Sequence, residues 1–167
     1  MAQQQDADTD AAMSAVTDAL LLHFGERLVV SQAVREQHGH DESWHPGAAP
    51  DAVVFPHSTQ EVAQIVAACA DHKVAVVPFG AGTSLEGHVT AVRGGVAIDM
   101  SQMTDVVRVS PEDLDCTVQA GISRKTLNAH LRDTGLFMPV DPGADATIGG
   151  MVSRRASGTN AVRYGTI

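Results

Sequence analysis

The spacing of hydrophobic residues predicts a helical N-terminal segment followed by alternating strands and helices. Apolar residues recur at helical spacing over residues 11–24, and Gly25 follows as a natural stop. A second, weaker helix is expected over residues 31–37. Residues 1–10 are predicted to be a disordered tail, and residues 38–51, which show no period, an extended linker.

A compact α/β pattern begins at residue 52. Two short apolar runs, 52–55 and 74–78, are expected to be strands, and residues 57–73 between them have helical spacing. Ser58 and Glu61 stand at capping-box spacing and mark the start of this helix. The later elements expected are strands over 94–100, 105–110 and 114–120 and a helix over 123–135.

Composition and charge narrow the class of protein. Hydrophobic residues make up 44% of the 167 residues and charged residues 19%, which suits a packed domain. The net charge of −9 argues against nucleic acid and anionic membranes as partners. Cys69 and Cys116 are expected to be separate thiols. The N-terminus "MAQQQDADTD" resembles neither a secretory signal nor a transit peptide, so a cytoplasmic protein is expected.

The stretch "PFGAGTSLEG" (78–87) follows a predicted buried strand and contains few side chains. Such a loop can present several backbone N–H groups to one anion, most often a phosphate. It is not a Walker loop, which needs a lysine, and its spacing differs from G-x-G-x-x-G. A tight turn in which glycine supplies a positive φ remains an equal alternative from this stretch alone.

A second glycine cluster, "DPGADATIGG" (141–150), combines a turn at Pro142-Gly143 with a helix start. Thr147 is placed to cap a helix whose first turn contains Gly149 and Gly150. Glycine in a helix costs about 1 kcal/mol relative to alanine. Two glycines together therefore indicate that something approaches this backbone closely, either a ligand or a neighbouring strand.

The motifs "VPFGAGTSLEGHV" and "DPGADATIGGMVSRRASGTNAVRYGT" resemble the FAD-linked oxidases of the vanillyl-alcohol-oxidase superfamily, above all the group of FAD-dependent D-lactate dehydrogenases and glycolate oxidase subunits. The resemblance implies an α+β fold: a PCMH-type FAD-binding domain made of small α/β subdomains, truncated, over residues 50–167. Residues 1–49 would supply the tail, helices and linker. It further implies non-covalent FAD, a small 2-hydroxy acid, an electron acceptor and a possible homo-oligomer for the full-length enzyme.

The same resemblance implies three groups of cofactor contacts. The first loop would wrap the FAD pyrophosphate, and the later motifs would lie beside the flavin, its ribityl chain and its phosphates. The residues are Phe79, Gly80, Ala81, Gly82, Thr83, Ser84, Gly87 and His88 in the first loop, then Asp141, Ala146, Thr147, Gly149, Gly150, Ser157, Gly158, Asn160 and Tyr164. No catalytic or metal-binding residue is assigned, since those of the family are expected beyond residue 167.

Most of the histidines are expected to have no catalytic or metal-binding role. His38, His40 and His45 are interpreted as a loose surface group in a polar linker, and His88 as a non-covalent neighbour of FAD. Two other functions remain open at this point. One is an inactive or merely flavin-binding fragment, and the other is a different flavin reductase of the same fold.

Overall fold

The computed structural model describes residues 2–167 and divides into two compact units. The N-terminal unit extends to Asp99, and the C-terminal unit runs from Met100 to Ile167. Each unit contains both helices and strands, so the predicted α+β class is confirmed. None of the helices in residues 2–167 has the length and apolar content that crossing a bilayer requires.

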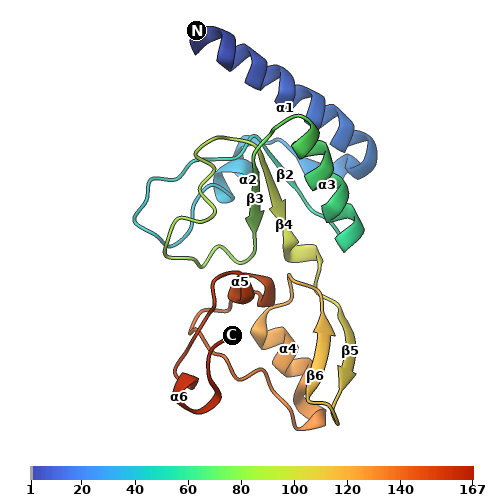
Figure 1. Cartoon of the computed structure of the whole chain (residues 1–167), viewed down its shortest axis with the longest axis vertical. Helices are drawn as coiled ribbons and strands as arrows, with labels where there is room; N and C mark the ends of the chain where they lie inside the picture. The colour runs from blue at the N-terminus through green and yellow to red at the C-terminus, as the bar shows by residue number, and fades with distance from the viewer. Residues whose placement is uncertain (1) are drawn as a thin grey trace. The chain divides into compact units, whose positions relative to one another are not determined.

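The N-terminal unit is built on a four-stranded sheet in the order β1-β2-β4-β3. Figure 1 labels three of its strands, β2, β3 and β4. The strands are β1 (Leu28–Val29), β2 (Ala52–Val54), β3 (Val76–Phe79) and β4 (Val96–Asp99). β1 runs antiparallel to β2, whereas β2, β4 and β3 are parallel. Since parallel strands end at one edge, Phe79 and Asp99, which are paired in register, lie together at the carboxyl edge.

Three helices accompany this sheet, α1 (Ala2–Phe24), α2 (Gln32–Gln37) and α3 (Thr59–Asp71). α1 runs alongside α3 (Figure 1), and both bury apolar side chains, among them Leu20 on α1 and Ile65 on α3. These two side chains belong to the core of the unit, together with the fully buried residues of β2 and β4.

The predicted capping box at the start of α3 is present. The Ser58 hydroxyl accepts a hydrogen bond from the Glu61 N–H at 3.2 Å. The Glu61 carboxylate accepts from the His57 N–H and, through both oxygens, from Arg27 at 2.7 and 2.8 Å. These bonds, first of all the one from Arg27, lower the pKa of Glu61 to about 2. The cap therefore also ties α3 to the 3-10 turn Gly25–Arg27 that follows α1.

Two expectations for the N-terminal unit need correction. Of residues 1–10, predicted to be a disordered tail, residues 2–10 belong to α1, and residue 1 lies outside the described residues. Alanine and glutamine are good helix formers, and neither glycine nor proline interrupts the chain before Gly25, so the helix extends upstream. β1 was not expected; it is two residues long, too short to show a period.

The C-terminal unit pairs β5 (Val106–Ser110) with β6 (Asp115–Val118) in an antiparallel hairpin that contains an irregularity near Arg108. Its helices are α4 (Arg124–Leu131), α5 (Ile148–Ser153) and the short α6 (Ala161–Tyr164), with 3-10 turns at Met100–Gln102 and Arg132–Thr134. Ile122, Leu127 and Leu131 form its core against the hairpin. The predicted strands and the helix starting at Ser123 are confirmed in type.

Both cysteines are free thiols, as expected. Cys69 is buried on α3, and this burial raises its pKa to about 11. Cys116 lies on β6 and is half-buried.

Candidate functional site

The first glycine loop leaves the carboxyl end of β3 with its backbone donors unpaired. Within residues 2–167, no group accepts a hydrogen bond from the four consecutive N–H groups of residues 80–83. Gly82 has a φ of +66°, and a Cβ there would come within 3.1 Å of the Phe79 ring. The predicted positive φ and the predicted row of donors therefore occur together. Carboxyl ends of parallel strands are the usual ligand-binding edge of α/β sheets.

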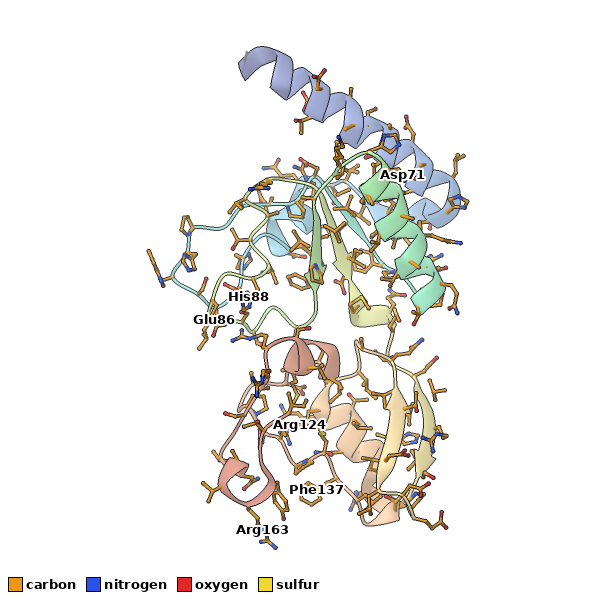
Figure 2. The ribbon with its side chains drawn as sticks, viewed as in Figure 1. Asp71, Glu86, His88, Arg124, Phe137 and Arg163 are labelled. Carbon is orange, nitrogen blue, oxygen red and sulfur yellow. The ribbon has the colours of Figure 1, made fainter. Side chains whose placement is uncertain are left out.

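The second half of this loop is closed by its own side chains. The Ser84 hydroxyl donates to Glu86 Oε2 at 3.1 Å and lies 3.1 Å from His88 Nδ1, and the Leu85 N–H also bonds Glu86. Figure 2 shows Glu86 and His88 next to one another on the loop. The Ser84 hydroxyl predicted to face FAD is thus already engaged, and the His88 side chain is 57% exposed.

The segment 39–48 packs against the glycine loop. The Glu42 N–H donates to the Ser84 carbonyl at 3.0 Å, and a Cβ on Gly87 would meet the His45 ring at 2.8 Å. Burial raises the pKa of Asp41, but the hydrogen bonds that it accepts, first of all from Ser43, outweigh burial and hold that pKa below its usual value. The predicted linker is irregular, as expected, yet it braces the loop.

The interpretation of the linker histidines as a surface group is wrong for His38, which is buried. His40 and His45 are exposed, but the His38 side chain is only 9% exposed. Its Nε2 lies 2.7 Å from Asp99 Oδ2 and its Nδ1 2.7 Å from the Val34 carbonyl. Sequence reasoning missed this because Asp99 is 61 positions away, and no local pattern joins the two.

In the second glycine motif the backbone donors are consumed inside the C-terminal unit. Thr147 caps α5 as predicted, accepting from the Gly150 N–H at 3.2 Å. The N–H groups of Ile148 and Gly149 donate to Ile122 and Ala120, both at 2.8 Å. A Cβ on Gly149 would lie 2.8 Å from that of Ala120. The close approach to Gly149 is therefore made by a protein neighbour, Ala120, which is one of the two explanations that the sequence left open.

Some of the remaining residues predicted to contact FAD make contacts within the C-terminal unit, and others are exposed to solvent. Gly158 lies directly on the Asp141 backbone with no room for a Cβ. The Asp141 carboxylate pairs with Arg124, labelled in Figure 2, at 3.1 Å, and Ala146 accepts from the Arg124 N–H. Tyr164, on α6, packs edge-to-face on Phe137 at 5.6 Å. Ser157 and Asn160 are exposed.

The residues of the first loop lie in the N-terminal unit, and those from Asp141 to Tyr164 lie in the C-terminal unit. The structure brings the first loop together with His38 and the brace 39–48, and it brings Asp141 together with Gly158. A glycine loop with four open N–H groups fits the needs of a diphosphate, which neutral dipoles can hold without cationic side chains.

Comparison with known proteins decides the family. Residues 50–167 match the family model described as FAD binding domain. The chain belongs to this family. FAD is the cofactor of these domains, so the predicted cofactor and the predicted resemblance are confirmed.

The relatives support this assignment. The chain is 50% identical over 161 residues to a probable mitochondrial D-lactate dehydrogenase of Danio rerio, covering 96% of this chain and 32% of that protein. It is 52% identical over 118 residues to a D-lactate dehydrogenase [cytochrome] of Arabidopsis thaliana, covering 71% of this chain and 21% of that one. The chain thus spans about a third or less of the length of these relatives. Relatives named as dehydrogenases do not favour the alternative of an inert fragment.

Solved structures agree on the fold. An alkyldihydroxyacetonephosphate synthase superposes with a TM-score of 0.84 at 28% identity, covering 91% of this chain and 31% of that chain. A BBE-like 1 protein of Physcomitrella patens superposes with a TM-score of 0.76 at 22% identity, over 90% of this chain and 33% of that chain.

The predicted cytoplasmic location is wrong. Relatives from Danio rerio, Arabidopsis thaliana, Saccharomyces cerevisiae and Kluyveromyces lactis are all named as mitochondrial. The expectation rested on the absence of a transit-peptide pattern in the first ten residues. Targeting segments are removable and are not part of the folded domain, so that absence carries little weight.

Proposed function

We propose that this chain is the FAD-holding part of an enzyme that oxidises D-lactate or a closely similar 2-hydroxy acid. The observation that carries the proposal is the 50% identity, over 96% of the chain, to a relative named D-lactate dehydrogenase. A glycolate oxidase subunit of Bacillus subtilis, 32% identical over 137 residues, keeps glycolate as the second candidate substrate. The cytochrome in the names of several relatives makes a cytochrome the proposed electron acceptor.

The chain's own contribution is to hold and orient the cofactor. The open N–H groups of residues 80–83 would bind the pyrophosphate, with Phe79 beneath them and Thr83 adding a hydroxyl. Ser84, Gly87 and His88 would shape the rest of that loop. Bound FAD supplies the capacity to accept two electrons.

The later motifs would line the remainder of the cofactor. The packing of Gly149 on Ala120 and of Gly158 on Asp141 sets the path of this backbone, so these glycines would act by shaping the loop. The other proposed contacts are Asp141, Ala146, Thr147, Gly150, Ser157, Asn160 and Tyr164. The domain boundary near residue 50 is part of the same proposal.

FAD is proposed to bind without a covalent bond. Between Phe79 and Gly87 the loop contains neither histidine nor cysteine, the side chains to which flavin is commonly attached. Acid precipitation of the intact protein should release the yellow colour into the supernatant. Colour retained in the pellet on a peptide containing His88 would contradict this.

The substrate is tested on the intact flavoprotein that contains residues 1–167. Under anaerobic conditions, D-lactate is expected to bleach the flavin absorbance, and L-lactate is the stereochemical control. Glycolate and D-2-hydroxyglutarate, added in parallel, rank the acid class, and cytochrome c reduction tests the acceptor. A protein that retains FAD but is bleached by none of these acids would refute the proposed reaction while leaving FAD binding intact.

A further inference from the structure

A column of side chains connects the buried His38–Asp99 pair to the first glycine loop. The ring centroids of His38 and Phe79 are 4.4 Å apart. The Phe79 ring in turn reaches Gly82, since a Cβ added to Gly82 would lie 3.1 Å from Phe79 Cζ. Phe55 also packs edge-to-face on His38, with ring centroids 5.9 Å apart. Asp99, His38, Phe79 and Gly82 therefore follow one another in contact at the carboxyl edge of the sheet.

The hydrogen bonds of His38 define its charge. Nδ1 faces the Val34 carbonyl and Nε2 faces the Asp99 carboxylate, each at 2.7 Å, and both oxygens can only accept when Asp99 is ionised. A neutral imidazole has one N–H and would leave one of these contacts without a proton. With Asp99 ionised, the geometry therefore favours the imidazolium form of His38, in a pair that is nearly removed from solvent, with 9% and 8% of the two side chains exposed.

We propose that His38 is a positioning residue for the pyrophosphate loop, holding Phe79, and through it Gly82, in the geometry that exposes the N–H groups of residues 80–83. The inference rests on the proposed role of that loop in binding FAD. Loss of the His38 proton would break one of its two hydrogen bonds, release the ring from Phe79 and loosen the loop. FAD affinity is therefore coupled to the protonation of a residue that does not touch FAD.

The surroundings of His38 give the direction of this dependence. The charged group that faces it is Asp99 on β4; α2 contributes the Val34 carbonyl, and the sheet edge contributes the uncharged rings of Phe55 and Phe79. Burial lowers the pKa of His38, but the bonds to Asp99 and Val34 outweigh it, and the pKa stands above its ordinary value of 6.5. The contribution is complete below that ordinary value and is lost as the pH rises through the raised pKa.

The test measures the dissociation constant of FAD against pH for the intact flavoprotein and its variants. In the wild type, affinity should fall as the pH rises through the pKa of His38. The His38→Gln variant should bind FAD about tenfold more weakly at low pH, with a flatter profile that meets the wild-type curve at high pH. His40→Gln, which changes an exposed histidine two positions away, is the matched control and should follow the wild-type curve.

A second variant separates positioning from mere structural support. Phe79→Leu leaves the His38–Asp99 pair in place but removes the ring between that pair and Gly82. Its FAD affinity should fall, and its pH profile should flatten, while NMR still detects the titration of His38. His88 lies beside Ser84 and Glu86 in the loop, and His88→Gln measures the contribution of this second histidine to the pH profile.

The outcomes are distinct. If His38→Gln folds and retains both the affinity and the pH profile of the wild type, the inference is overturned. If it does not fold, Phe79→Leu decides: a wild-type pH profile in that variant also overturns the inference, and a flat one supports it. Wild-type protein that binds no FAD would instead refute the proposed function of the loop, and this inference with it.

Discussion

Gly82 and Gly149 both lie in motifs of small residues at the end of a strand or the start of a helix, but their backbones have different surroundings. Around Gly82, four consecutive N–H groups find no acceptor within residues 2–167, and the glycine has a φ of +66°. Around Gly149, the first three N–H groups of α5 are bonded to Ile122, Ala120 and the Thr147 side chain. Glycine therefore accompanies open backbone donors in the first motif and close protein packing in the second.

This contrast shows why glycine content is an incomplete guide to a cofactor site. Both motifs look alike in sequence, and both resemble segments of one domain family. The accounting of backbone hydrogen bonds separates them, because a donor already paired within the fold can bind a ligand only after breaking that bond. Substitutions at the two motifs should accordingly change different measurements.

Gly82→Val is expected to have the largest effect, the loss of FAD retention. A β-branched residue is strongly disfavoured at this φ, and its side chain would collide with the Phe79 ring. The measurement is the flavin-to-protein absorbance ratio of the purified intact protein. Gly135→Val is the control, since Gly135 has a φ of +76° but nothing within 4 Å of its Cβ position. Stoichiometric flavin in Gly82→Val would show that the first motif is not the pyrophosphate loop.

Gly149→Ala should lower stability by about 1–3 kcal/mol, because the added methyl group overlaps the Ala120 backbone and side chain. Thermal unfolding is the appropriate measurement. The adjacent Gly150→Ala is a close control: its Cβ would meet only the Thr147 hydroxyl at 3.0 Å. A smaller effect is expected there. Equal destabilisation by the two changes would contradict the packing explanation for Gly149.

Much of the local structure could be predicted from the sequence because its causes are local. The capping pairs at Ser58 and Thr147 act within one helical turn, and each is present. The order of strands and helices from residue 52 follows from their periods. The motifs also identified the family and its cofactor, which rest on short segments in a fixed order.

The features that could not be predicted depend on contacts between distant segments. The burial of His38 requires Asp99, and the bracing of the glycine loop requires residues 39–48 to fold back onto it. The engagement of the Gly149 N–H by Ala120 is likewise invisible in a pattern of small residues. The sequence showed which residues are unusual, but the hydrogen-bond partners of each decide what it can do.

Thr147→Ala should lower stability by about 1 kcal/mol through loss of the helix cap. Thr147→Ser, which keeps the capping oxygen, is the control and should retain most of the stability. This change also exposes the Gly150 N–H, so it sharpens the comparison of the two motifs. A substantial rise in FAD affinity when that donor was freed would contradict the contrast between the motifs, because it would show that an N–H group of the second motif can also bind the cofactor.

Ser84→Ala should have the smallest effect, a change of less than about threefold in the dissociation constant of FAD. The Ser84 hydroxyl donates to Glu86 and lies beside His88, so its donor is already used within the loop. Thr83→Val is the comparison, because the structure places Thr83 in the row of open N–H groups and gives its hydroxyl no partner among residues 2–167. A larger loss of affinity is therefore expected for Thr83→Val than for Ser84→Ala. Fluorescence titration of the apoprotein with FAD measures both, and the reverse order would show that Ser84 leaves Glu86 to bind the phosphates.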